Sequence, residues 1–270
     1  MGPMAHPLTL LAVIPVVLGM IVFLVPLGGA VVSVANDPIL WESVKVYYVD
    51  EDLSKGLLRS FLLPLVVTAF SLILGSLSAI IYYWGADRVK TIVRAALLIP
   101  LFVHPMVLVF GLLVLFRQGP ISHGIDYVFR WLGPHGGAWA SVVAVMTLLL
   151  YPLVGWLLIL AVDRVPWGER AAACNLGARP LLVLRDVVLP HTRDALWAGA
   201  ILVFVHATGF FIVPVLMGDG WVNTLPVLLV DHMEVGLSTQ AHAIAVTLIG
   251  PITLLAILGV RQMVKARVVA

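Results

Sequence analysis

Six stretches of this 270-residue chain are each long and apolar enough to cross a lipid bilayer as a helix, which takes about 20 mostly apolar residues. They cover residues 8–34, 61–84, 95–116, 138–162, 195–217 and 241–260. The chain is 61% hydrophobic and 11% charged, whereas a soluble domain carries about 25% charged residues. One water-soluble core cannot bury this much apolar surface. The sequence therefore predicts an all-α, polytopic membrane protein with six transmembrane helices and a single domain over residues 1–270.

The placement of the charged residues predicts the orientation of these helices. Eleven of the 16 Lys and Arg residues lie in the loop 85–94, in the loop 163–194 or in the tail after residue 260. The other five share the opposite side with nine of the 14 acidic residues. Because cytoplasmic loops carry the excess of Lys and Arg, we expect the first side, and both termini with it, to face the cytoplasm. The chain has no basic block of the kind that binds nucleic acid.

The loop 163–194 carries the most informative pattern in the sequence. Residues 169–176 predict a helix, and Gly177 stands where a glycine ends a helix. A second helical segment is predicted over 181–188, with its end at Pro190. The loop then presents a helix, a glycine and a second helix to water, with small side chains that fit a partner's cleft. The alternative is a surface loop that lies on the lipid headgroups.

This loop resembles the EAA loop of the ABC-importer permeases, whose pattern is EAA, three residues, G, nine residues, I, one residue and LP. The matching residues are Ala171, Ala172, Ala173, Gly177, Val187, Leu189 and Pro190. Residues 172–178, AACNLGA, are similar to the family's AAxxLGA string, and residues 204–218 are similar to a stretch of the spermidine/putrescine-type permeases. The resemblance covers a core of about 58–262.

The chain departs from the family at one position, because the family's glutamate falls on Ala171. The nearest acid, Glu169, is two positions earlier, about 200° around a helix, so we do not expect it to serve on the same face. The residues that the resemblance implies for coupling to an ATPase are Glu169, Arg170, Ala171, Ala172, Ala173, Leu176, Gly177, Ala178, Leu189 and Pro190.

The resemblance implies a type I ABC-importer permease fold and a bacterial inner-membrane location. The implied partners are a second permease subunit, identical or homologous, a cytoplasmic ATPase dimer that receives the loop 163–194, and an extracytoplasmic substrate-binding protein. The sequence has no G-x-x-x-x-G-K-[ST] motif, so ATP and Mg²⁺ are expected on the ATPase, and this chain is expected to bind no cofactor and to be no enzyme. The single cysteine, Cys174, has no metal-ligand spacing around it.

Polar side chains inside the predicted spans are few, and each is a candidate for the transport pathway because burying it in a bilayer is costly. A histidine that bonds a neighbouring carbonyl, or a ring that packs between helices, is the alternative interpretation for each site. Span five lines the pathway by resemblance, and apolar rings there form a candidate gate. The predicted pathway and gate residues are His104, Phe204, His206, Thr208, Phe210, Phe211 and Pro214.

The substrate is the least constrained part of the prediction. A polyamine such as spermidine or putrescine is the leading candidate, because the outer side is acidic. Phosphonates, ferric iron, thiamine and inorganic anions are the alternatives within the same branch of permeases. Two other classes stay open: an intramembrane hydrolase, with Ser76 as nucleophile and His104 or His206 as base, and a non-catalytic membrane scaffold.

Overall fold

The computed structural model describes residues 51–115 and 135–236, together with the single positions 25, 28, 29, 32, 36, 241, 244, 245, 247 and 248. This part of the chain is almost entirely helical and contains no strand, which confirms the predicted all-α class. The predicted spans 8–34 and 241–260 lie outside the described residues except at those single positions.

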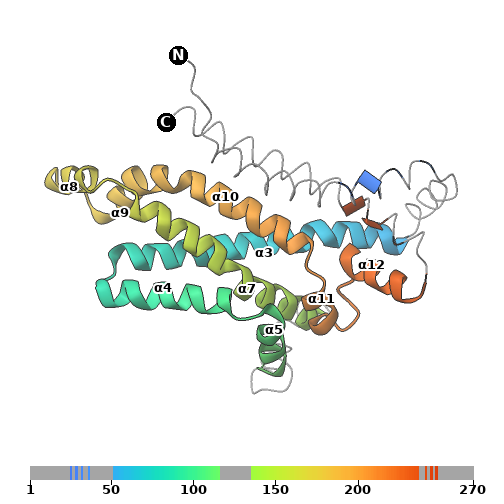
Figure 1. Ribbon diagram of the computed structural model, residues 1–270. Coiled ribbons are helices and arrows are strands. Elements are labelled where there is room, and N and C mark those ends of the chain that lie inside the picture. The colour runs from blue at the N-terminus through green and yellow to red at the C-terminus, as the bar shows by residue number, and fades with distance from the viewer. Residues whose placement is uncertain are drawn as a thin grey trace, which may run out of the picture.

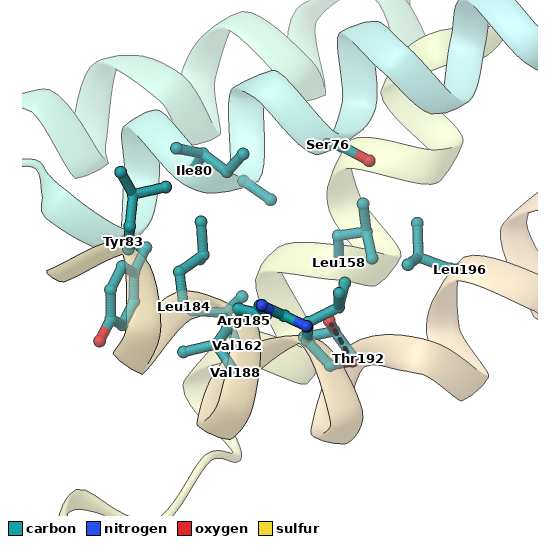
Figure 2. A pocket seen from close by; sticks show the side chains of 13 residues that line it. Ser76, Ile80, Tyr83, Leu158, Val162, Leu184, Arg185, Val188, Thr192 and Leu196 are labelled. Atoms are coloured by element: carbon teal, nitrogen blue, oxygen red, sulfur yellow. Dashed lines mark hydrogen bonds between the residues drawn. The ribbon is translucent and has the colours of Figure 1, made fainter. Parts of the chain in front are cut away.

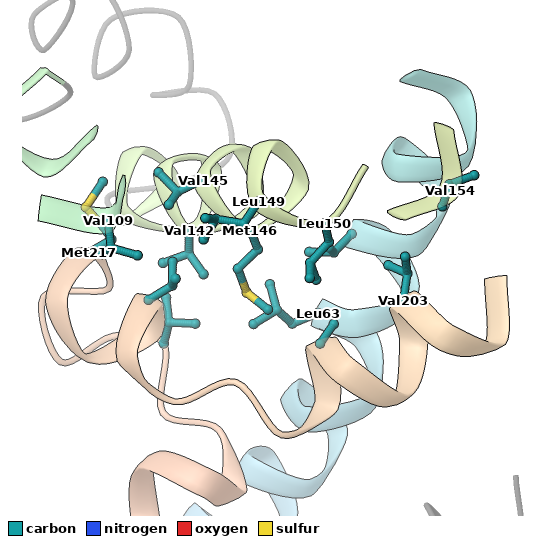
Figure 3. Close-up of a cluster of buried hydrophobic side chains, with 14 of the residues drawn as sticks. Leu63, Val109, Val142, Val145, Met146, Leu149, Leu150, Val154, Val203 and Met217 are labelled. Carbon is teal, nitrogen blue, oxygen red and sulfur yellow. The ribbon is translucent and has the colours of Figure 1, made fainter. Parts of the chain in front are cut away.

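Three long helices, α3 (Glu51–Trp84), α7 (Gly136–Asp163) and α10 (Leu189–Thr208), lie side by side and form the centre of the bundle (Figure 1). A fourth helix, α4 (Asp87–Phe102), packs against α3 and α7. The buried side chains between them are almost all aliphatic, and Figure 3 shows Val142, Met146 and Leu150 of α7 turned toward α3 and α10. This core includes Leu63, Val142, Met146, Leu150, Val154 and Val203.

Glycines allow the closest helix contacts of the bundle. A Cβ atom added at Gly75 of α3 would stand 2.7 Å from Cγ1 of Val154 on α7. A Cβ atom at Gly155 would stand 2.8 Å from Cδ2 of Leu97 on α4. Small residues at a helix interface let two backbones approach closely, which is the main route to tight packing inside a membrane. The α3–α7–α4 contact therefore depends on the absence of a side chain at these two positions.

The second and fourth predicted spans are confirmed as helices with longer bounds. Within the described residues, three helical segments are long and apolar enough to cross a membrane: Ser54–Trp84, Gly136–Asp163 and Pro180–Thr208. The number rises to four if α4 and the helix that follows it count as one bent span.

The third predicted span, 95–116, is not one straight helix. It is divided between α4 and α5 (Pro105–Leu113), whose axes differ by 100°. The break falls at His104, which has an extended backbone (φ −57°, ψ 130°) because the ring of Pro105 disfavours the helical conformation of the residue before it. The prediction of one continuous span was wrong because the apolar pattern continues through a change of direction.

The fifth predicted span, 195–217, begins after the start of the observed helical segment and ends beyond its last residue, because that segment is Pro180–Thr208. One continuous helical segment runs from α9 (Pro180–Val183) through a π-helical turn, η3 (Leu184–Val188), into α10. The predicted stop at Pro190 was therefore wrong, and the second half of the loop 163–194 is the beginning of a long helix. The π turn, in which the Leu189 N–H donates to the Leu184 carbonyl, widens the helix where the proline would otherwise disrupt it.

At its other end this helix stops at Thr208, before a short helix, α11 (Ile212–Met217). The last described helix of the chain, α12 (Leu225–Glu234), lies with α11 toward the end of the bundle opposite α9 (Figure 1). Its first N–H, on Leu225, donates to the buried Ser60 hydroxyl of α3 over 2.6 Å. This bond satisfies one of the free N–H groups at a helix start and fastens α12 to the bundle.

Candidate functional site: the coupling segment and the pathway cavity

The predicted helix at 169–176 is confirmed as α8 (Trp167–Asn175), which lies at one end of the bundle (Figure 1). Gly177 follows it with φ +79°, a left-handed conformation that glycine adopts without strain. The next N–H, on Ala178, donates to the Ala173 carbonyl over 3.1 Å, and the Gly177 N–H donates to the Cys174 carbonyl over 2.9 Å. These bonds close the last turn of α8, so the chain reverses sharply at Gly177.

The surface of α8 and its flanks is exposed and largely apolar. No residue of α8 is buried. Trp167 at its start is 79% exposed, and Leu176 directly after it is 88% exposed. Leu181, at the start of the next helix, is 72% exposed. Large apolar side chains exposed to this degree are typical of a surface that contacts another protein or the membrane.

Two charged residues of α8 contact other elements of the chain. Arg170 donates to the Val162 carbonyl at the end of α7, and its guanidinium carbon lies 4.9 Å from the ring centroid of Tyr83 on α3. The Glu169 carboxylate lies 3.5 Å from Nε2 of His191, in the first turn of α10. Glu169 is the acid nearest to Ala171, the position of the family glutamate, and its carboxylate is engaged with His191.

A polar cluster at the same end of the bundle was missed by the sequence analysis. The Tyr82 hydroxyl donates to the Asp163 carboxylate over 3.0 Å to Oδ1 and accepts from Arg94, and Arg94 also donates to Asp163 over 3.0 Å. The cluster joins the ends of α3 and α7 to the middle of α4. The available signal was the placement of Arg94 and Asp163 at the ends of two predicted spans, each next to apolar residues.

A cavity of about 190 Å³ lies between part of the long α9–α10 helix and the bundle. Figure 2 shows that its walls come from α3, α7 and the η3–α10 segment. The lining is almost entirely apolar, with Arg185, Ser76 and Thr192 as its polar exceptions besides Tyr83. Beside this cavity, η3 contacts the bundle through the buried Val188, which packs with Tyr82, Ile159 and Val162.

A second, more open cavity of about 450 Å³ lies where α10 ends. It brings together three of the predicted pathway residues, His206, Phe210 and Phe211, around the helix break at Gly209. The rings of His206 and Phe210 are 5.6 Å apart between centroids, and His206 is exposed. A break in a spanning helix beside a cavity is where transporters commonly place a solute.

The other predicted pathway residues lie elsewhere. Thr208 is buried, and its hydroxyl donates to the Phe204 carbonyl of its own helix over 2.7 Å. Pro214 is buried in α11, and Phe204 is half-buried outside the lining of the cavity. His104 begins α5, where its Nδ1 accepts a hydrogen bond from the Met106 N–H over 3.3 Å.

The geometry gives no support to a metal site or a hydrolase within the described residues. No group of three or more His, Cys, Asp or Glu side chains is placed to hold a metal ion there. Ser76 lines the cavity beneath η3, and no histidine shares that lining. His206 lines the other cavity, and His104 is bonded to the backbone of its own turn.

The sequence resembles several curated transport proteins. The chain is 32% identical over 174 residues to the molybdenum transport system permease protein ModB of Azotobacter vinelandii, covering 61% of this chain and 75% of ModB. It is 24% identical over 221 residues to the spermidine/putrescine transport system permease protein PotC of Escherichia coli, covering 82% and 76%. It is 26% identical over 180 residues to the putative 2-aminoethylphosphonate transport system permease protein PhnU of Salmonella paratyphi A, covering 64% of this chain but 61% of PhnU, less than two thirds of its length.

Two solved ABC transporters share the fold. A chain of the inward-facing MetNI methionine transporter matches with a TM-score of 0.61 at 17% identity, over 80% of this chain and 98% of that chain. A chain of an amino acid ABC transporter solved with histidines matches with a TM-score of 0.53 at 15% identity, over 77% and 92%. The substrates named among the curated relatives differ, so they do not single out the polyamine subgroup. The predicted family itself is confirmed, since residues 71–267 match its profile, and the chain belongs to the binding-protein-dependent transport system inner membrane component family.

Proposed function

We propose that this multi-pass membrane protein is the permease subunit of an ATP-driven importer. In this proposal it forms the translocation pathway with a second permease subunit, identical or homologous, and both of its termini face the cytoplasm. The observation that carries the proposal is the α8–Gly177–α9 element, which projects from one end of an apolar bundle and exposes small and apolar side chains.

The exposed element is proposed to dock into a cleft of a cytoplasmic ATPase. Ala172 and Cys174 are exposed on α8, and a helix with short side chains can enter a narrow cleft closely. Trp167 and Leu176 stand exposed at its two ends, where their apolar surface would meet the walls of the cleft. The ATPase would hold ATP and Mg²⁺, and its closure would move α8.

The pathway is proposed to run past the cavity at the end of α10. Its lining is aromatic and aliphatic, with the His206 imidazole as its polar side chain. Phe210 and Phe211 flank the helix break, and apolar rings at a constriction can close a pore by excluding water. Rotation of either ring would change the width of the cavity, and Phe210 also packs against the bundle core.

The cargo is proposed to be a small solute delivered by an extracytoplasmic binding protein, with polyamines as the first class to test. PotC aligns with a larger share of this chain than ModB or PhnU does. No carboxylate lines the cavity at His206 within the described residues, so selectivity for a cation would rest mainly on the binding protein. Uptake of labelled spermidine, 2-aminoethylphosphonate and molybdate by cells that express the complete system separates these candidates.

A matched pair of glycine variants tests the proposed coupling. Gly177 and Gly236 have nearly the same backbone conformation, φ +79° and +81°, and a Cβ atom at either would meet nothing within 4 Å. They lie toward opposite ends of the bundle, after α8 and after α12. Gly177→Arg is expected to abolish ATPase co-purification and uptake, and Gly236→Arg to retain the ATPase. Equal ATPase recovery and uptake in both variants would contradict the proposal.

A further inference from the structure

We propose that Glu169 and Arg170 act as positioning residues that hold α8 to the bundle at two points, so that a movement of α8 is passed to α7 and α10. This inference rests on the proposed function for its role in transport, but the contacts themselves are properties of this chain. It assigns the two side chains to contacts within the permease and not to contacts with the ATPase.

Apolar packing does not fix the orientation of α8. None of its residues is buried, and the bulky side chains at its two ends point into solvent. The helical segment that follows it does pack on the bundle, through the buried Val188 and its neighbours, but this contact includes no residue of α8. A nine-residue helix with so little buried surface keeps a defined orientation only if polar contacts hold it.

Arg170 supplies the first contact. It is half-buried, donates to the Val162 carbonyl and lies over the ring of Tyr83. Val162 is in the last turn of α7, and its carbonyl also accepts the Val165 N–H over 3.2 Å. Carbonyl groups at the C-terminus of a helix carry partial negative charge, so a guanidinium is well matched to that position. The Tyr83 face adds a cation–π contact from α3.

Glu169 supplies the second contact, to a different element. Its carboxylate meets Nε2 of His191, and Nδ1 of the same ring lies 2.8 Å from the Val187 carbonyl. The bond to the Val187 carbonyl orients the ring and turns Nε2 toward Glu169. Because a carbonyl and a carboxylate both only accept hydrogen bonds, the two contacts are attractive together in the imidazolium form, which carries a proton on each ring nitrogen. His191 directly follows Pro190, at the junction between the π turn and α10.

The two contacts together set the rotation of α8 about its own axis. Neighbouring helical residues point in directions about 100° apart, so Glu169 and Arg170 reach α10 and α7 separately. One contact alone would leave α8 free to roll about it. With both in place, a displacement of α8 pulls on the beginning of α10 and on the end of α7 at the same time.

The native Cys174 allows a direct test of the positioning in the permease alone. It is exposed on α8 and is the single cysteine of the chain, so a nitroxide attached there reports the motion of α8 without an engineered site. In full-length protein in lipid nanodiscs, Arg170→Met is expected to raise the mobile fraction of the label about threefold, the effect of losing one charge-assisted contact and one cation–π contact. Arg179→Gln, an exposed arginine just beyond α8, is the matched control and is expected to leave the spectrum unchanged. Identical spectra for Arg170→Met and Arg179→Gln would overturn the inference.

Coupling is the second measurement, because a merely structural contact would not change it selectively. In proteoliposomes with the ATPase and the binding protein, Arg170→Met is expected to retain the ATPase but to transport about threefold less solute per ATP hydrolysed. Glu169→Lys and His191→Glu are each expected to lower this ratio, and the double variant, which reverses the ion pair, to restore it. An unchanged ratio in all three single variants would overturn the inference. Failure of the wild-type chain to recruit any ATPase would instead contradict the proposed function, while the label spectra would still decide the contacts.

Discussion

The transmembrane bundle and the helix α8 follow each other closely in the chain but are held by different kinds of contact. In the bundle, aliphatic side chains of α3, α7 and α10 pack against one another, and glycines allow the helices to approach closely. In α8, no residue is buried, and charged side chains make the contacts to the bundle. A close-packed interface resists gradual displacement, whereas an exposed helix held by a few polar contacts has room to move. The proposed function requires such a difference, because it combines a rigid pathway with a coupling element that moves.

The largest expected effect comes from filling the closest contact of the bundle. Gly75→Leu would drive a side chain into Val154, and overpacking of this kind costs about 1–3 kcal/mol and occasionally more. We expect a clear fall in the temperature at which the purified protein aggregates, measured by size-exclusion chromatography after heating. Gly111→Leu is the control, since a Cβ atom there meets nothing within 4 Å. Equal losses in the two variants would contradict the account of the bundle.

The next prediction concerns the polar cluster of Tyr82, Arg94 and Asp163, at the end of the bundle near α8. Asp163→Ala leaves Arg94 and Tyr82 without their shared acceptor, and because the pair is partly exposed we expect a loss on the order of 1 kcal/mol. The same heating assay measures it. Asp194→Asn, which removes one charge from an exposed 3.8 Å pair, is expected to leave the midpoint unchanged. A midpoint that is insensitive to Asp163→Ala would show that the cluster does not fasten the helix ends.

The effect expected at the end of α8 is local and does not reach the stability of the bundle. Gly177→Ala forces an alanine into the left-handed region at a cost of about 1–2 kcal/mol, but it leaves the bundle untouched. Hydrogen exchange of the Ala178 amide, which closes the last turn of α8, is expected to accelerate, while that of core amides in α7 is not. Gly168→Ala, in the first turn of α8 with ordinary φ, should not accelerate it. Faster hydrogen exchange of the α7 core amides as well would contradict the proposed difference between α8 and the bundle.

The smallest expected effect concerns His104, which the sequence analysis placed in the pathway. Its Nδ1 caps the start of α5, and the exposed 3.3 Å bond is worth about 0.5 kcal/mol. If capping is its whole role, His104→Ala lowers uptake slightly and His104→Asn, whose side chain also caps a helix, restores it. A large loss with both variants would show that the imidazole itself takes part in transport.

The sequence predicted the helices best where apolar residues continue without a change of direction. The helices α3 and α7 contain Pro64 and Pro152 yet remain unbroken, whereas the chain turns by 100° at His104 and Pro105. A proline alone therefore does not determine where a spanning helix breaks. At His104 the side chain satisfies the N–H of the next helix, so the break costs little. That bond depends on side-chain placement, which apolar periodicity does not contain.

In the candidate site too, features set by neighbouring residues were predicted, whereas contacts between distant residues were not. The helix α8 and its glycine were predicted because short-range spacing specifies both. The contacts of Glu169 with His191 and of Arg94 with Asp163 join residues far apart in the chain, and local patterns do not specify such pairs. The continuation of the helix through Pro190 was missed because a π turn leaves no simple signature in the sequence.

The central claim, that α8 is the contact surface for an ATPase, is tested most directly by cross-linking from Cys174 in native membranes. The cysteine is exposed on α8 and needs no partner variant. A thiol-reactive photo-cross-linker attached there is expected to capture an ABC ATPase, identified by mass spectrometry. The same reagent on Gly236→Cys in a Cys174→Ser background, toward the opposite end of the bundle, is expected to capture none. Capture of no ATPase from Cys174, in membranes shown to contain the ATPase, would contradict the account.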